Sequence, residues 1–277
     1  MTQTARASLR PDNVTKSRSR AGTSPALLGA AGLVAFVGLF EVLPRAGVLP
    51  QEYFPAASTI GRTLGTLVTE STFWVSFGET VQTWAIGLAI AVSAGTVLGL
   101  VIGTIPALRA ATSSTIEFLR PIPSVALIPL VIVLVGTDME STLILVVYAS
   151  FWQMLIQVLY GVADVDPVAR ETALSYRLGP LARLRYLVFP TALPYALTGL
   201  RLAASVALIL AVTGELVIGS PGLGKDIQVA SSSNSTALVY ALIVVTGLIG
   251  LTANLVARAV QRYALAWHPS VRADVPA

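Results

Sequence analysis

Six stretches of the chain are long and apolar enough to cross a bilayer as helices, and polar segments separate them. A helix needs about 20 apolar residues to span the hydrocarbon core, where no water satisfies a free backbone amide. The stretches cover residues 25–40, 80–105, 115–135, 142–162, 196–218 and 236–257, some with tilt or a short polar interruption. We therefore expect an all-α membrane protein with about six transmembrane helices.

The segments outside these stretches predict two tails and one surface helix. Residues 1–24 are rich in basic residues, Ser and Thr and nearly free of large apolar side chains, which is typical of a disordered tail. We expect a transmembrane domain over 25–265, a C-terminal tail over 266–277 and a short amphipathic helix over 58–68. A cleaved signal peptide is the alternative for the first apolar run, but no A-x-A-like site follows it.

Composition supports the membrane assignment and narrows the chemistry. Only 12% of the residues are charged, against 55% hydrophobic, and the mean hydropathy is +0.76. The net charge of +4 fits basic membrane loops better than nucleic-acid binding. The chain has no cysteine and one histidine, so neither a disulfide framework nor a metal site is expected.

Basic residues divide unequally between the two sides of the predicted helices. With the N-terminus inside, the outer loops hold three of them, Arg45, Arg62 and Lys225. The inner side holds thirteen, namely Arg6, Arg10, Lys16, Arg18, Arg20, Arg109, Arg170, Arg177, Arg183, Arg185, Arg258, Arg262 and Arg272. Because Lys and Arg concentrate on the cytoplasmic side of membrane proteins, both termini are expected to be cytoplasmic.

The predicted cytoplasmic loop between the fourth and fifth helices, about 163–195, is the longest charged interior region. Asp166 and Pro167 indicate a helix start, residues 171–178 favour helix, and Gly179 followed by Pro180 is expected to end it. A second amphipathic stretch, 181–188, is expected to end at Pro190. Two short helices here indicate either a docking element or ordinary loop helices resting on lipid headgroups.

One motif in this loop resembles the EAA loop of bacterial ABC importer permeases. Glu171-Thr172-Ala173 is followed at a distance by Phe189-Pro190 and by 192–194, Ala-Leu-Pro. The resemblance implies a coupling helix that inserts into a groove of an ATPase subunit. The family usually has Gly six residues after the Glu, whereas this chain has Arg177 there and Gly179 two residues later. The turn that the Gly would make is therefore expected to be shifted or replaced.

The resemblance covers roughly residues 55–265, and segments 119–136 and 198–224 are similar to the branch that imports nitrate, sulfonates, taurine and related solutes. It implies a multi-pass permease of the bacterial cell membrane that is not itself an enzyme. ATP and Mg²⁺ would bind a separate ABC ATPase, and this chain would bind no cofactor. An extracellular solute-binding protein would deliver the solute to a homodimer or a pair of similar permeases. The resemblance does not identify the solute, and pyrimidine vitamin precursors are a further candidate.

Two other classes of protein remain as alternatives. An ion-coupled secondary transporter would be expected to show paired intramembrane acids or inverted halves, and only Glu215 stands deep in a predicted helix. A membrane enzyme would need a cluster of His, Cys or acids in the helices. The segment 219–226, GSPGLGKD, fits the spacing of a P-loop, but it lacks the following Ser or Thr and a preceding strand, so a turn is the better interpretation.

Four residues are candidates for a translocation path or gate. Glu215 either contributes to the path or serves as a structural hydrogen-bond acceptor, since a buried charge must face protein or water. Arg201 lies about 21 Å from it along one helix and is expected to snorkel toward the cytoplasm. Pro123, with its neighbouring prolines, is expected to kink the third helix beside a cavity or neighbouring protein. Gln153 offers a polar contact from the fourth helix.

Small residues in the second helix predict close helix packing. Gly95, Gly99 and Gly103 recur every four residues, with Gly87 two such intervals before Gly95. This spacing places them on one helix face, where another backbone can approach. Packing against a neighbouring helix is the first interpretation, and lining a pore is the alternative.

Overall fold

The structure is a computed structural model that describes residues 25–266, and every regular element in that part is helical. The elements run in the order α1 (Pro25–Arg45), α2 (Ala57–Leu67), α3 (Ser71–Thr104), α4 (Pro106–Leu119), the 3₁₀ turn η1 (Ser124–Leu127), α5 (Ile128–Val135), α6 (Met139–Ala163), α7 (Pro167–Ser175), α8 (Pro180–Arg183), the π-helical turn η2 (Leu184–Val188), α9 (Phe189–Ile218), α10 (Leu223–Ser232) and α11 (Thr236–Ala264). The predicted tails 1–24 and 267–277 lie outside the described residues.

Five helices of the described chain are long and apolar enough to cross a membrane, and a sixth span exists if a bent pair is counted as one. The all-α prediction with about six spans is confirmed. The expectation that prolines kink the third helix is confirmed, and the kink is a full break, because α4 and the segment Ser124–Val135 meet at an angle of 80°. Pro121 and Pro123 lie in the break, where neither can donate a backbone hydrogen bond.

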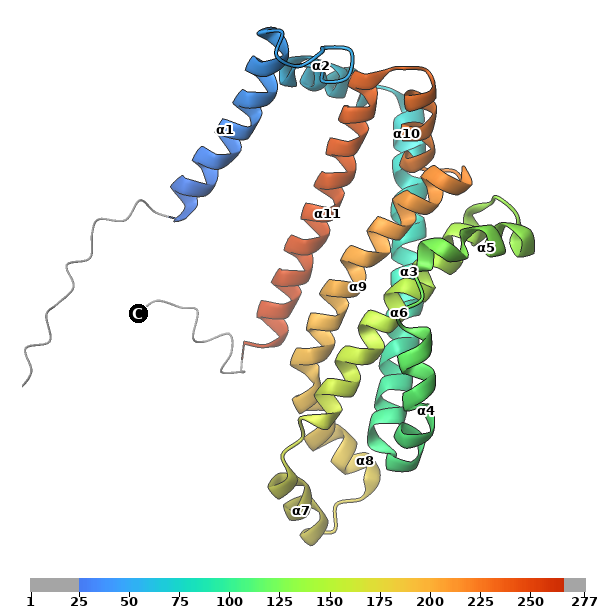
Figure 1. Cartoon of the computed structure of the whole chain (residues 1–277). Helices are drawn as coiled ribbons and strands as arrows, with labels where there is room; N and C mark the ends of the chain where they lie inside the picture. Colours follow the sequence, from blue (N-terminus) through green and yellow to red (C-terminus); the bar gives the residue numbers. More distant parts are fainter. Residues whose placement is uncertain (1–24, 267–277) are drawn as a thin grey trace, which may run out of the picture.

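Helix α6 is the centre of the bundle and packs between α3 and α9 (Figure 1). The predicted glycine face of α3 is pressed against α6. A Cβ added at Gly95 would lie 2.8 Å from Met154, and one at Gly99 would lie 2.8 Å from Val158. Gly87 and Gly103 meet α6 in the same way. The glycines therefore serve helix packing, as their spacing predicts, because only a residue without a Cβ permits this approach.

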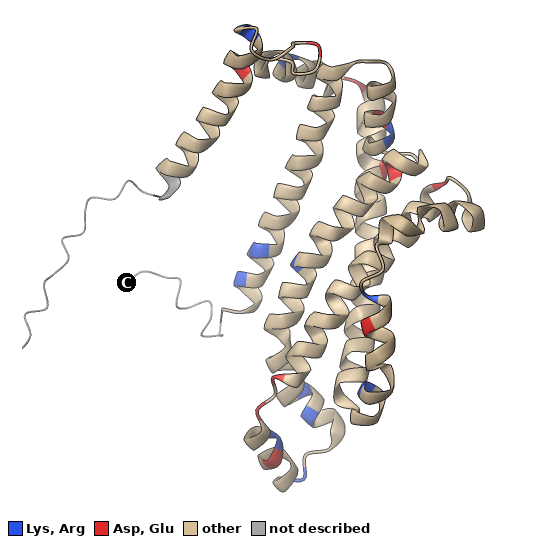
Figure 2. Ribbon diagram, viewed as in Figure 1, with Lys and Arg blue, Asp and Glu red and all other residues tan. Residues whose placement is uncertain are grey.

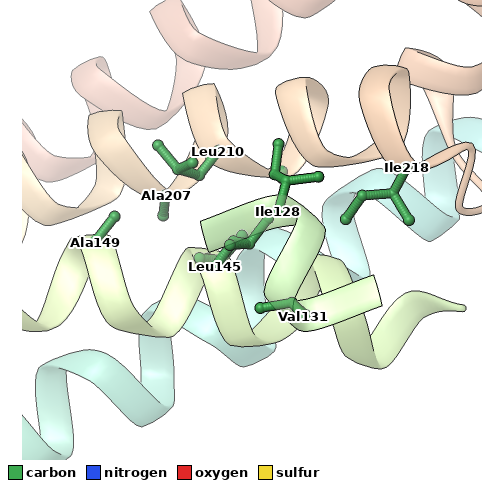
Figure 3. Packing of buried hydrophobic residues seen from close by; sticks show 9 residues of the cluster. Ile128, Val131, Leu145, Ala149, Ala207, Leu210 and Ile218 are labelled. Atoms are coloured by element: carbon green, nitrogen blue, oxygen red, sulfur yellow. The ribbon is translucent and has the colours of Figure 1, made fainter. Parts of the chain in front are cut away.

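The largest buried apolar cluster joins α5, α6 and α9 (Figure 3). Its members are Ile128, Val131, Leu145, Val146, Ala149, Ala207, Leu210, Ala211 and Ile218. Small alanines on α9 face larger side chains of α6, so the two helices approach closely. Large apolar side chains elsewhere remain exposed, which is what a surface in contact with lipid tails requires.

The first helix, α1, stands away from the bundle (Figure 1) and is joined to it at one end. Glu41 accepts the Ser58 N–H at 2.8 Å and forms a salt bridge with Arg45 at 2.6 Å. Phe40 approaches Tyr240 of α11 with ring centroids 6.3 Å apart. The predicted amphipathic helix is present as α2, which lies between α1 and α11.

The expectation that a helix ends at Pro190 is wrong, since one helical body runs from Pro180 to Ile218 over 39 residues. A proline in a helix removes one N–H and clashes with the carbonyl four residues earlier. The π-helical turn Leu184–Val188 directly precedes Phe189 and Pro190, and its wider ring accommodates the proline. The loop and the fifth span are consequently one continuous helix.

Candidate functional site

The short helix α7 and the turns beside it project from one end of the bundle (Figure 1). Asp166 caps the helix, its Oδ1 accepting the Val168 N–H at 2.9 Å, and Pro167 occupies the first turn. Both features are predicted by the sequence. Glu171 and Thr172 are exposed, whereas Ala173 is buried with 6% of its surface accessible. The helix therefore presents its polar residues outward while Ala173 holds it in place.

The turn after α7 is made at Arg177, which has φ of +54°. The Leu178 N–H donates to the Ala173 carbonyl at 2.9 Å and the Arg177 N–H to the Leu174 carbonyl at 2.9 Å. This pair of bonds is the Schellman arrangement that ends many helices, usually with glycine in the left-handed position. The expectation that this turn is shifted or replaced is wrong, because Arg177 itself adopts the glycine-like conformation and makes the turn at the usual position.

Gly179 has another role than the one expected of it. The helix ends at Ser175 rather than at Gly179-Pro180, and Gly179 precedes the first residue of α8 with an extended conformation. Around it, large side chains are exposed: Tyr176 by 79%, Leu181 by 77% and Phe189 by 50%. These exposed apolar side chains and the exposed Glu171 belong to the same projecting end of the bundle, and large apolar side chains gathered on a surface are a feature of protein-contact surfaces.

Glu215 lies at the opposite end of the bundle, fully buried among α3, α9 and α10. Its Oε2 accepts the Thr80 hydroxyl at 2.8 Å and the Gly224 N–H at 2.9 Å. Thr80 in turn accepts the Leu223 N–H at 2.8 Å. Two free amides of the first turn of α10 are thereby satisfied. This geometry supports the structural interpretation of Glu215, with the carboxylate positioning α10.

The segment GSPGLGKD packs tightly on Glu215. A Cβ added at Gly222 would overlap the Glu215 carboxylate, and one added at Gly224 would overlap the Val212 carbonyl. The segment joins α9 to α10 without a preceding strand, and its amides at 223 and 224 already bond to Thr80 and Glu215. A P-loop offers such amides to phosphate, so the segment is a packed turn.

The structure does not bring the four path candidates together. Arg201 and Glu215 lie on one continuous helix about 21 Å apart, as expected. Arg201 is half-buried, six residues beyond Tyr195, whose hydroxyl donates to Asp164 at the end of α6. Gln153 is half-buried on α6, and Pro123 is exposed in the break. The four residues thus occupy separate places in the bundle.

Two charged residues that the sequence analysis did not select lie at the end of α4: Glu117 in its last turn and Arg120 at the start of the break. Glu117 and Arg120 are exposed there and line a cavity of about 560 Å³ together with Arg109, Ser113 and Tyr160. The signal that points to them is the charge itself, since each stands inside a stretch long enough to span a membrane. Both residues lie near the start of the predicted third span, where charged residues are common, so this signal was not recognised.

Comparisons with known proteins agree with these features. Residues 95–265 match the model of the family described as binding-protein-dependent transport system inner membrane component. The taurine transport system permease protein TauC of Escherichia coli (strain K12) is 30% identical over 223 residues, 80% of each chain. The putative aliphatic sulfonates transport permease protein SsuC of Bacillus subtilis (strain 168) is 26% identical over 253 residues, 91% of each chain.

A solved structure shows the same fold at lower identity. The crystal structure of an amino acid ABC transporter with histidines contains a chain that matches with a TM-score of 0.57 and 20% identity. The match covers 72% of this chain and 97% of that one. The matched family region includes α7 and every span from α4 onward. The chain belongs to the binding-protein-dependent transport inner membrane components, the permease subunits of ABC importers.

Proposed function

We propose that this permease imports a small oxyanion, of the class of taurine, aliphatic sulfonates or nitrate, delivered by an extracellular binding protein. A separate ABC ATPase binds ATP and Mg²⁺ and docks on α7, and this chain binds no cofactor. The solute class is supported by the relatives for taurine and sulfonates. The observation that carries the docking proposal is an exposed, doubly capped α7 that projects from the bundle.

The continuous helix from Pro180 to Ile218 supports a mechanical link between the two ends of the bundle. It begins four residues after Tyr176, beside α7, and reaches Glu215, which holds α10 at the far end. A rigid body of this length transmits a displacement of α7 across the membrane. ATP-driven closure of the ATPase subunits would in this way switch the path from inward-facing to outward-facing.

The charge distribution supports a cytoplasmic position of α7. Figure 2 shows Lys and Arg at both ends, but the end with α7 carries more of them. Among the described residues, this end holds Arg109, Arg170, Arg177, Arg183, Arg185, Arg258 and Arg262. The end with α2 and α10 holds Arg45, Arg62 and Lys225. This excess supports the proposal that α7 and both termini lie in the cytoplasm of the bacterial cell.

Two permeases are proposed to enclose the path, as a homodimer or with a similar subunit. Helix α5 projects from the bundle (Figure 1), and its outer face exposes Leu130 by 56%, Val133 by 83% and Leu134 by 71%. Because the chain has no cysteine, Val133→Cys introduces a single thiol for cross-linking. We expect a disulfide-linked dimer under oxidation, whereas only monomer would contradict an α5 interface.

A charge reversal on α7 tests the docking proposal. The purified chain is combined with candidate ATPase subunits in liposomes, and ATP hydrolysis and complex formation are measured. We expect Glu171→Arg to abolish both, because an exposed carboxylate of α7 becomes a cation. Glu140→Arg, an exposed residue at the other end of the bundle, is the matched control and should change neither. Unaltered coupling in Glu171→Arg would remove α7 as the docking element.

A further inference from the structure

The break between α4 and α5 leaves a polar backbone in a membrane-spanning region. Pro121 and Pro123 carry no N–H, so the carbonyls at the end of α4 lose their helical donors. The Tyr148 hydroxyl of α6 donates to one of them, the Leu119 carbonyl, at 2.8 Å. Irregular backbone at membrane depth persists only where it is buried in protein or lines a polar cavity.

Two independent paths along the chain place the break near the middle of the bilayer. Arg120 is eleven residues from Arg109 at the other end of α4, about 16 Å along a helix, against a hydrocarbon thickness of about 30 Å. Tyr148, which contacts the break, is nine residues from the start of α6 at Met139 and fifteen from its end at Ala163. Both helices therefore put Arg120 far from either surface.

The charges at this depth have no protein partner in the described part of the chain. Glu117 and Arg120 are both exposed and form no salt bridge within residues 25–266, where the one ion pair is between Arg45 and Glu41. Both line the cavity of about 560 Å³, which also receives Arg109. A charge near the bilayer centre is costly unless it faces water or an ionic partner, so this cavity is suited to a charged solute.

We propose that this cavity, the break cavity, is a solute-binding site for a small oxyanion that also carries an ammonium group, such as an aminoalkanesulfonate. The Arg120 guanidinium, a planar fork of donors, binds the oxyanion. The Glu117 carboxylate binds the ammonium group. Arg120 keeps helical backbone geometry, so the two residues lie three apart on one helix face, with Cβ atoms about 5–6 Å apart. One two-carbon solute reaches both groups.

The charged residues that line the break cavity favour a solute with both an oxyanion and an ammonium group over simple anions such as nitrate. Two arginines and one glutamate line it, so a simple cation is repelled and an anion is attracted. An anion without an amine, such as nitrate, would leave the Glu117 carboxylate unpaired beside bound negative charge. The inference rests on the proposed import of a small oxyanion and specifies which members of that class bind within the membrane.

Three two-carbon probes separate the two charges: taurine carries both, ethanesulfonate lacks the ammonium and ethylammonium lacks the sulfonate. Their dissociation constants are measured by ligand-observed NMR on the purified permease–ATPase complex without binding protein. We expect taurine to bind tightest. Arg120→Gln should weaken taurine and ethanesulfonate about tenfold or more, with partial recovery in Arg120→Lys, because a charge-assisted contact is lost. Glu117→Gln should abolish the preference for taurine over ethanesulfonate.

The controls separate solute binding from folding. Arg262→Gln, exposed on α11, should leave all constants unchanged. If Arg120→Gln does not assemble with the ATPase, the test rests on Glu117→Gln. The proposal is then overturned if Glu117→Gln still prefers taurine over ethanesulfonate as strongly as the wild type does. Binding of none of the probes by the wild-type complex also overturns it.

Uptake measurements distinguish failure of this site from failure of the proposed function. The wild-type transporter, with ATPase and binding protein, is reconstituted in liposomes and supplied with taurine and ethanesulfonate. If ATP drives no uptake of either, the proposed solute class is wrong. If wild type imports taurine and Arg120→Gln imports it equally well, the import function stands and the break cavity is not a solute site.

Discussion

At the scale of single residues, Thr80 and Glu215 show how a polar pair is tolerated inside the bundle. Thr80 donates to Glu215 and accepts the Leu223 amide, so one hydroxyl serves both α9 and α10. Both side chains have no accessible surface. A buried polar group without a partner costs more than a hydrogen bond contributes, so each member of this set depends on the others.

Thr80→Val removes the shared hydroxyl while keeping the shape of the side chain. We expect the free energy of unfolding to fall by about 2 kcal/mol, because the Leu223 amide and one contact of Glu215 become unsatisfied. Thermal unfolding of the detergent-solubilised protein measures the change. Thr252→Val on the exposed face of α11 is the control and should shift the midpoint little. Equal shifts in both variants would contradict the role given to Thr80.

Arg177 carries a conformational cost that glycine would not. A non-glycine residue in the left-handed region loses about 1 kcal/mol. We therefore expect Arg177→Gly to raise the stability of α7 by about this amount, and to leave the Schellman turn unchanged. Hydrogen exchange of the α7 amides reports it, with slower exchange expected. Faster exchange in Arg177→Gly would mean that the guanidinium, rather than the backbone, stabilises the turn.

At the scale of elements, α3 and α6 fit together because glycines on the contact face of α3 leave room for larger side chains of α6. The α3 glycines meet side chains of α6 with the same spacing of eight, four and four residues: Val146, Met154, Val158 and Val162. A close approach of this kind gains packing contacts, which drive helix association where lipid is as apolar as the protein. The spacing alone predicts a packing face, but the identity of its partner required the structure.

Gly99→Leu tests this packing. A Cβ there would lie 2.8 Å from Val158, so we expect α3 and α6 to be forced apart and the stability to fall by about 3 kcal/mol. Gly247→Leu on α11 is the control, because nothing lies within 4 Å of a Cβ at that position. Thermal unfolding in detergent compares the two. The packing role of the glycine face is wrong if Gly99→Leu is as stable as Gly247→Leu.

At the scale of the whole molecule, the two ends of the bundle have different tasks. One end carries α7 with its exposed surface, and the other carries α10 locked on Glu215 (Figure 1). The break cavity lies between them, in the depth of the spans. A topology with α7 inside the cell is required for docking of an ATPase, because ATP is cytoplasmic.

The absence of cysteine allows this topology to be tested in intact cells. We expect Ser175→Cys, at the end of α7, to be protected from a membrane-impermeant thiol reagent until the cells are permeabilised. Ser231→Cys, exposed on α10, should react without permeabilisation. Their reactivities reverse if the bundle is inserted the other way, and the docking proposal is then excluded.

The sequence by itself determined the number of spans, the glycine face, the start of α7 at Asp166 and the family. These depend on local causes: apolar length, periodicity and capping chemistry act over a few residues. The boundaries were less predictable. Helix α3 begins at Ser71 rather than near 80, where Phe73 is buried beside Leu223 and Leu242. Glu79 interrupts the apolar run between Phe77 and the longer stretch that follows, so the packing of Phe73, rather than apolar length, shows where the helix begins.

Only the tertiary structure decided what each special residue does. Pro190 continues a helix because the preceding π turn makes room for it, and Arg177 makes the turn expected of glycine because its amide bonds to Leu174. Glu215 serves α10 because Thr80, 135 residues away in the chain, lies beside it. Arg120 lies in the break without a salt bridge in the described residues, although Glu117 is only one helical turn away. Contacts between distant segments decide these outcomes, and a local pattern cannot contain them.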